Sequence, residues 1–253
     1  MSGNHDSSEE EIADSALNPY SDLSLLDTHS KYDSLWMLAK SLETQDEADL
    51  RVKNIYLMIY SWASDEGNYQ MQVKACDVLS NRYAQEEKDD NSLYFLQTGL
   101  DLSEKYLGEK DTLYADLLQQ GAQRFIFKDT VTFKEYSEKE FNIRNQSLPP
   151  SHSSYASYFN TQGYFYFGVR RDVDSALSYF EKALEIGLVN LPKLASNVGS
   201  YFNNVAHCQG MLGEYELSMA NQRLSLKYKL LKANVFDKIK GYSSIANAIN
   251  NQG

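Results

Sequence analysis

A pair of amphipathic helical segments recurs along this 253-residue chain every 40 to 43 residues. When "NNVAHCQGMLG" (203–213) is aligned with "SSIANAINNQG" (243–253), the apolar, small and glycine positions coincide at an offset of 40. Earlier segments align at offsets of 41 to 43, and the small residues brought together are Ser80, Gly121, Gly163, Ala206 and Ala246. A small residue in register suggests that the two helices of each pair cross closely there. A repeated helix pair of this length predicts an α-solenoid.

Within the repeats, the spacing of apolar residues is helical. In "DVDSALSYFEKALEIGL" (172–188), apolar residues follow one another at three- and four-residue steps, which places them on one face of a helix. No segment alternates with a period of two, and the chain has only 4 prolines to interrupt helices. The sequence therefore predicts an all-α fold of about 11 helices. The predicted helices are 31–43, 47–64, 68–85, 91–107, 111–127, 130–145, 152–168, 173–187, 194–212, 214–232 and 236–252.

The repeats do not extend to the start of the chain. Residues 1–28 have little periodicity and include the run Glu9-Glu10-Glu11, so we expect an acidic disordered tail. Residues 29–253 are predicted to form one solenoid domain. The last segment ends on a glycine where a turn to a second helix would begin. Either this segment is a solvating terminal helix, or the array continues beyond residue 253.

The repeats resemble tetratricopeptide repeats (TPRs). In that family helix A carries a small residue midway, glycine marks the turn, and helix B carries small and aromatic residues. "DVDSALSYFEKAL" matches this pattern with Ala176, Phe180 and Ala183, and "GEYELSMANQRLS" (213–225) matches it with its glycine and two serines. The long period is similar to that of kinesin light chain, MalT-like domains and bacterial signalling arrays. The resemblance implies a right-handed superhelix of antiparallel helix pairs.

The match is uneven along the chain. It is strongest from about residue 90 onward, and the first helix pair keeps the helical rhythm without the family pattern, as a divergent cap would. Gln222 replaces the helix-B aromatic residue, and Glu135 lies near an expected small position. The register of the helix pair at 111–145 therefore stays open.

Composition and motifs argue against several functions. A net charge of −11 and a pI of about 4.9 are unsuited to direct nucleic-acid binding. No apolar run approaches a membrane span and the start lacks a secretory signal, so we expect a cytoplasmic protein away from membranes. The four histidines show no metal-ligand spacing, and there is no phosphate-binding or nucleophile motif. We expect no enzyme activity, no metal and no cofactor.

The two cysteines are expected to be structural. Cys76 and Cys208 are far apart in sequence, and both fall on predicted helices as small apolar residues. Cys208 follows His207, but adjacent residues on a helix point about 100° apart and do not form a nucleophile–base pair.

The TPR resemblance also implies where a partner would bind. In TPRs, residues three before, one after and four after the small position of helix A face the concave groove. Here these rules give peptide-binding or partner-binding candidates, with one lysine a turn earlier on the last helix: Asn160, Tyr164, Phe167, Asn203, His207, Lys240, Asn247 and Asn250. Asparagine can donate to and accept from a peptide backbone. Alternatively, these asparagines pair with neighbouring helices inside the scaffold.

Two functions remain open from the sequence. The first is a protein-interaction scaffold that binds a peptide or partner protein in the groove. The alternative is an N-terminal sensor or regulatory arm of a larger signalling or caspase-like protease protein.

Overall fold

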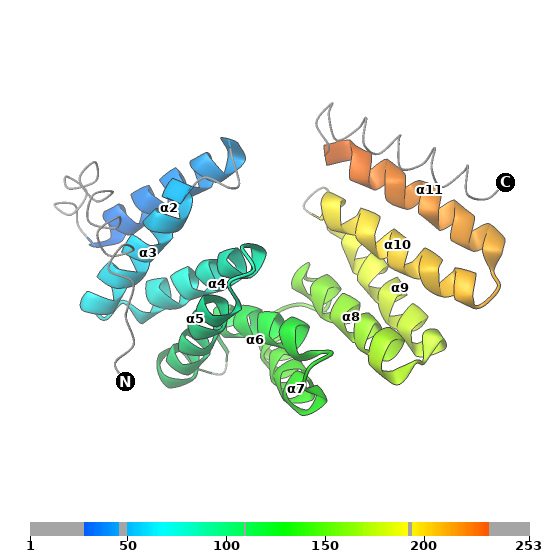
Figure 1. Cartoon of the computed structure of the whole chain (residues 1–253), viewed down its shortest axis with the longest axis horizontal. Coiled ribbons are helices and arrows are strands. Elements are labelled where there is room, and N and C mark those ends of the chain that lie inside the picture. The colour runs from blue at the N-terminus through cyan, green and yellow to red at the C-terminus, as the bar shows by residue number, and fades with distance from the viewer. Residues whose placement is uncertain (1–27, 46–49, 109, 192–193, 233–253) are drawn as a thin grey trace. The chain divides into compact units, whose positions relative to one another are not determined.

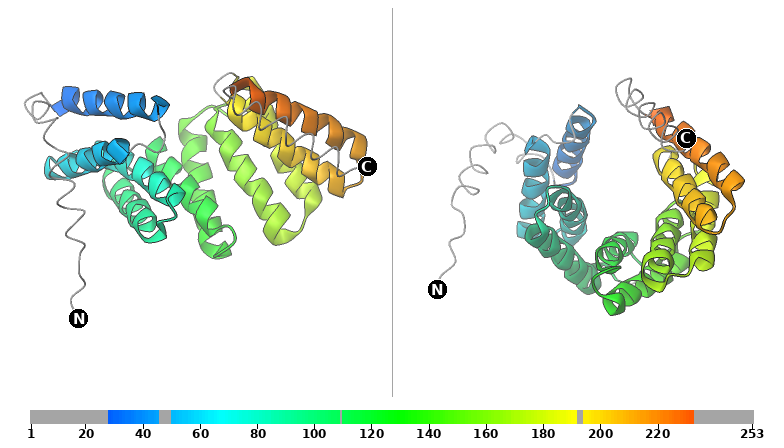
Figure 2. Two further views of the ribbon diagram at one scale, coloured as in Figure 1. Left: turned by 45° about the horizontal axis from the view of Figure 1, so that its top comes forward. Right: turned by 45° about the vertical axis from the view of Figure 1, so that its right-hand side comes forward.

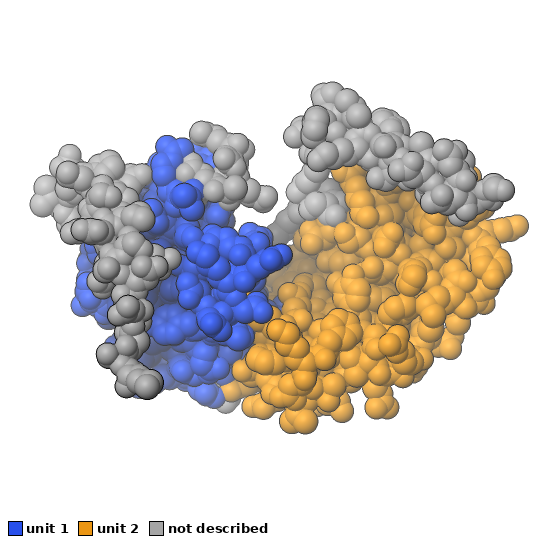
Figure 3. Space-filling view, in the orientation of Figure 1, with its two compact units in different colours: residues 1–120 blue, residues 121–253 orange. Residues whose placement is uncertain are grey.

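The computed structural model describes residues 28–45, 50–108, 110–191 and 194–232, and these are helical without any strand (Figure 1). The chain divides into two compact units, residues 1–120 and 121–253, shown separately coloured in Figure 3. We call them the first unit and the second unit. The predicted tail (1–28), apart from its last residue, and the predicted last helix (236–252) lie outside the described residues.

In the first unit, consecutive helices pack against one another: α2 against α3, α3 against α4, and α4 against α5. Their bounds are α2 Thr28–Gln45, α3 Leu50–Asp65, α4 Tyr69–Gln85 and α5 Asp89–Leu102, followed by a π-helical turn, η2 Ser103–Leu107. Helix α6, Thr112–Phe125, begins in this unit and ends in the next.

The second unit continues in the same way. Helices α8 to α11 lie side by side in chain order, each antiparallel to the one before (Figure 2). The bounds are α7 Thr130–Ser147, α8 Ser154–Tyr164, η3 Phe165–Arg170, α9 Val173–Val189, α10 Ala195–Met211 and α11 Tyr215–Lys232. The prediction of an all-α solenoid of antiparallel helix pairs is confirmed.

Ten of the predicted helical segments correspond to an α-helix of the described residues. Two segments that were predicted to be single helices, 91–107 and 152–168, are α-helices that end in the π-helical turns η2 and η3. A π-helical turn inserts an extra residue into the i→i+4 ladder, and a three-to-four-residue apolar period cannot distinguish it from a continuing α-helix.

Helices A and B cross closely at the small positions. Ser80 on α4 and Ser92 on α5 exchange hydrogen bonds, each hydroxyl donating to the other residue's carbonyl. In the last pair, the Ser218 hydroxyl on α11 donates to the carbonyl of Ala206 on α10 at 2.7 Å. At Gly163 on α8, an added Cβ would lie 2.4 Å from the Phe180 ring on α9. The expected reason for the small residues is therefore confirmed.

The pair α6–α7, whose register the sequence left open, also has a ring against the small residue of helix A. Gly121 on α6 faces Tyr136 of α7, whose ring would lie 2.4 Å from an added Cβ. Glu135, which the family pattern placed near a small position, is exposed, and the buried residues beside it are Phe133 and Ser137. A ring thus packs against the glycine of helix A here, as Phe180 does at Gly163.

Turns and caps follow simple local chemistry. Gly213 adopts φ 82° at the turn between α10 and α11, where the left-handed backbone favours glycine. Asp172 caps α9, with its carboxylate accepting from the Ser175 backbone N–H at 3.0 Å. Gly187 lies in the last turn of this helix and packs against Tyr201 and Val198 of α10.

The first helix pair is attached to α4 by polar contacts. Glu43 of α2 accepts hydrogen bonds from Arg82 of α4 at 2.6 Å and from the Tyr56 hydroxyl of α3 at 3.2 Å. Farther along, Lys53 of α3 pairs with Glu86 at the end of α4 at 2.9 Å. Charged side chains thus join the first helix pair to α4.

Candidate binding surface

In the second unit, five predicted groove residues fall on two neighbouring helices A, α8 with its π-helical end η3, and α10. We call them the A-face: Asn160, Tyr164, Phe167, Asn203 and His207. Asn203, His207 and Tyr164 are exposed, while Asn160 and Phe167 are half-buried. The Phe167 and His207 rings approach to 5.1 Å between centroids, so the two helices meet at this face.

Three side chains on these helices form a hydrogen-bonded relay. The Tyr164 hydroxyl of α8 donates to Asn204 Oδ1 of α10 at 3.2 Å, and Asn204 Nδ2 donates to Asn160 Oδ1 at 2.8 Å. Asn204 is buried and was not among the predicted site residues. One arm of Asn160 therefore serves the scaffold, as the alternative interpretation of these asparagines predicted.

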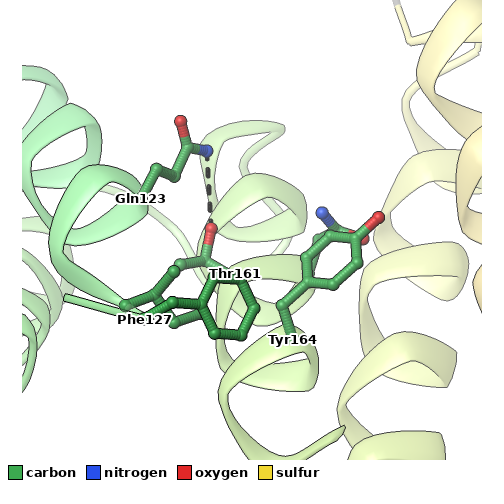
Figure 4. A pocket seen from close by; sticks show the side chains of 6 residues that line it. Gln123, Phe127, Thr161 and Tyr164 are labelled. Atoms are coloured by element: carbon green, nitrogen blue, oxygen red, sulfur yellow. Dashed lines mark hydrogen bonds between the residues drawn. The ribbon is translucent and has the colours of Figure 1, made fainter. Parts of the chain in front are cut away.

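A pocket of about 270 Å³ opens beside this relay, between the end of α6 and helix α8 (Figure 4). None of its lining residues carries a charge: Gln123, Ile126, Phe127, Asn160, Thr161 and Tyr164. Its apolar walls are the rings of Phe127 and Tyr164, which are 65% and 41% exposed. Gly168 of η3 leaves room for Phe127, since an added Cβ would lie 2.4 Å from that ring.

The pocket's polar edge comes from α6. Gln123 Nε2 donates two long hydrogen bonds to α8, to Thr161 Oγ1 at 3.4 Å and to Ser157 Oγ at 3.5 Å, the first of which is drawn in Figure 4. Sequence reasoning missed Gln123 and Phe127 because both lie outside the three positions that the repeat rule selects. The exposed phenylalanine after the end of a helix was the one available signal.

The first unit has a related contact between its helices A. Gln120 of α6 donates to the carboxylate of Asp77 on α4, which occupies the position three before the small Ser80. Burial raises the pKa of Asp77 to about 6, repulsion from Asp116 adds to this, and the Gln120 hydrogen bond and Lys40 oppose it. This position of helix A thus contacts the next helix A in both units.

The other residues that the sequence singled out show no feature of a catalytic or binding site among the described residues. Cys76 and Cys208 are free and buried, and burial raises the pKa of their thiols to about 12 and about 11, which opposes a nucleophilic role. Gly210, four after Ala206, faces Ser218 of α11 rather than the A-face. Lys240, Asn247 and Asn250 lie outside the described residues.

Two searches of the described part of the chain give negative results. No group of three or more histidine, cysteine or acidic side chains is placed to hold a metal ion there. Among the same residues, no helix has both the length and the apolar character needed to cross a bilayer.

The chain is similar in fold to solved TPR-like repeat proteins. BtubC (BKLC) from P. vanneervenii superposes with a TM-score of 0.68 at 18% identity, over 88% of this chain and 91% of that protein. Two structures of a putative kinesin light chain with nearly identical TPR-like repeats, from Podosopora anserina, give TM-scores of 0.58 and 0.57. Their identities are 12% and 14%, over 81% and 82% of this chain and 97% and 100% of theirs.

These similarities define the class of protein. The described helices have the TPR-like repeat fold, and the predicted resemblance to long-period repeats of the kinesin light chain type is confirmed. Neither a protein-family model nor a curated protein sequence matches the chain. At 12–18% identity the likeness concerns the fold, which in general suits a protein-interaction scaffold.

Proposed function

We propose that the chain is a non-enzymatic interaction scaffold that binds a peptide segment of a partner protein on the A-face of the second unit. The observation that supports this most is the combination of exposed asparagine and aromatic side chains with an uncharged pocket on neighbouring helices A. Asparagine can bond a peptide backbone whatever its sequence, and an apolar pocket can hold one of its side chains.

The energetics require several contacts in series. One hydrogen bond contributes about 0.5–1.5 kcal/mol net, so an amide on each helix A would add modestly to the affinity of an extended peptide. An apolar side chain buried in the pocket adds about 1.5–3 kcal/mol. Affinity at the micromolar level needs about 8 kcal/mol in total, so the pocket and the amides must act together.

The proposal is tested by selecting peptides from a random library on the full chain and measuring their affinity calorimetrically. Asn203→Ala removes an exposed A-face amide and is expected to weaken binding about two- to tenfold. Asn142→Ala, which removes an exposed asparagine from helix B α7, serves as the matched control. Selected peptides that bind equally to wild type, Asn203→Ala and Tyr164→Ala would refute binding at the A-face.

The regulatory-arm alternative, the protein's location and its lack of contact with nucleic acid stay predictions. No described residue favours a second function over the scaffold.

A further inference from the structure

The relay between α8 and α10 determines which end of the Asn160 amide faces the pocket. Asn160 Oδ1 accepts from Asn204 Nδ2 at 2.8 Å, so this oxygen points toward α10. An amide carries its oxygen and nitrogen on opposite arms of one plane. Asn160 also lines the pocket, and the arm left for that side is its Nδ2, which can only donate.

The order of donors in the relay follows from Tyr164. Its hydroxyl donates to Asn204 Oδ1 at 3.2 Å, which leaves Asn204 only its Nδ2 to offer Asn160. A tyrosine hydroxyl can also accept, but its oxygen lone pairs are delocalised into the ring and donation is the stronger interaction. The same bond fixes Tyr164, whose ring is further held edge-on against Phe180 at 5.3 Å.

Resting on the proposed function, we propose that Asn204 is a positioning residue that makes this pocket specific for an uncharged apolar side chain beside a carbonyl. The apolar part of the ligand would lie between Phe127 and Tyr164, and its carbonyl would accept from Asn160 Nδ2. No charged side chain lines the pocket, so a carboxylate or an ammonium would be desolvated there without an opposite charge. The volume of about 270 Å³ suits one or two amino-acid side chains rather than a cofactor.

Capped single amino acids test the specificity directly. N-acetyl-L-leucinamide offers an apolar side chain flanked by carbonyls, N-acetylglycinamide lacks the side chain, and the capped glutamate and lysine carry charges. We expect the leucine probe to bind in the millimolar range, about what its size allows, and to shift the NMR signals of the Ile126 and Thr161 methyls and the Asn160 side-chain amide. Equal shifts with the glycine or the charged probes would overturn the proposal.

Two variants separate positioning from a merely structural role. Asn204→Ala removes both relay bonds, and we expect the leucine probe to bind about three- to tenfold more weakly. Asn204→Asp can still accept from Tyr164, but it cannot donate, so Asn160 must turn its Nδ2 toward α10 and its oxygen toward the pocket. It should therefore bind the probe as poorly as Asn204→Ala. If Asn204 only held the helices together, Asn204→Asp would bind the probe as wild type does, and the proposal would fail.

Thermal unfolding shows that each variant is folded under the titration conditions, and Asn142→Ala again serves as the control. The outcome also separates this inference from the broader one. A library-selected peptide whose affinity depends on Asn203 but not on Asn204 would overturn the inference and leave the proposed function standing. A dependence of that peptide on both residues supports the two together.

Discussion

Gly163→Ala tests how closely helices α8 and α9 cross. An ideal Cβ at this position would lie 2.4 Å and 2.5 Å from two carbons of the Phe180 ring. Carbon atoms in contact are normally about 3.5–4.0 Å apart, so ring and helix must separate by about 1 Å or more. Phe180 is only 2% exposed and packs against Ala176, Val205 and Cys208, which leaves the ring little room.

The magnitude follows from two opposing effects. Overpacking of this kind costs about 1–3 kcal/mol, and replacing glycine by alanine within a helix returns about 0.8–1 kcal/mol. A Cβ 2.4 Å from a ring with little room belongs in the upper half of the overpacking range, about 2–3 kcal/mol, so we expect Gly163→Ala to lower the free energy of unfolding by about 1–2 kcal/mol. For a chain of this length that corresponds to a fall of about 2–8 °C in the unfolding midpoint.

Gly210→Ala is the matched control. The nearest atom to its added Cβ is the Ser218 hydroxyl oxygen at 3.3 Å, and a shift of a few tenths of an ångström, which its 2.7 Å hydrogen bond to the Ala206 carbonyl can absorb, relieves the contact. This variant gains helix propensity without a large clash and should be neutral or slightly stabilised. The assay is urea denaturation followed by circular dichroism, with Gly163→Ala/Phe180→Leu as a double mutant in which the smaller side chain relieves the clash. If Gly163→Ala is as stable as Gly210→Ala, the close crossing is refuted.

Two further substitutions test buried charges. Asp77→Asn should raise the free energy of unfolding by about 1–2 kcal/mol at pH 7.5 and hardly at all at pH 4. The pKa of Asp77 is raised to about 6 in the folded state, so ionisation of this carboxyl destabilises the folded state as pH rises from about 4 to above 6. An equal gain at both pH values would contradict this. Glu140→Gln removes the buried carboxylate that accepts from the Arg144 guanidinium at 2.8 Å, where both side chains are at most 2% exposed. We expect a loss of about 3–5 kcal/mol in urea denaturation, against almost none for the exposed Glu138→Gln, and similar values for both would contradict it.

The helix pairs could be predicted because the residues that bring two helices together lie within a single repeat of the sequence. A small residue midway along helix A and another small residue or a ring on helix B are local features, and they repeat within each pair. Ser80 with Ser92 and Gly163 with Phe180 satisfy that rule in different ways, yet both bring the helices close together. Periodicity alone was therefore sufficient for the number and order of the α-helices in the part of the chain that the structure describes.

Contacts between successive pairs were less predictable, since each depends on side chains about 40 residues apart. Gln120 reaches Asp77, Gln123 reaches Thr161, and Asn204 reaches Asn160, but the reaching residue lies at a different place relative to the small position each time. The repeat rule locates one partner of each contact at most. Which residue of the next helix meets it depends on helix rotation and on π-helical ends, which the apolar period does not reveal.

Asn203 and Asn204 show why the two interpretations of the asparagines need not compete. They are neighbours in sequence and point about 100° apart on α10, so one is exposed on the A-face while the other is buried against α8. In our proposal Asn160 combines both roles in one side chain, because its oxygen is bonded to Asn204 and its nitrogen, on the opposite arm of the amide, would bond the ligand. A side chain held by the scaffold loses little further freedom on binding, so its hydrogen bond to a ligand costs less entropy than one from a freely rotating asparagine. Scaffold contacts at this position would therefore favour the ligand binding that we propose at the A-face.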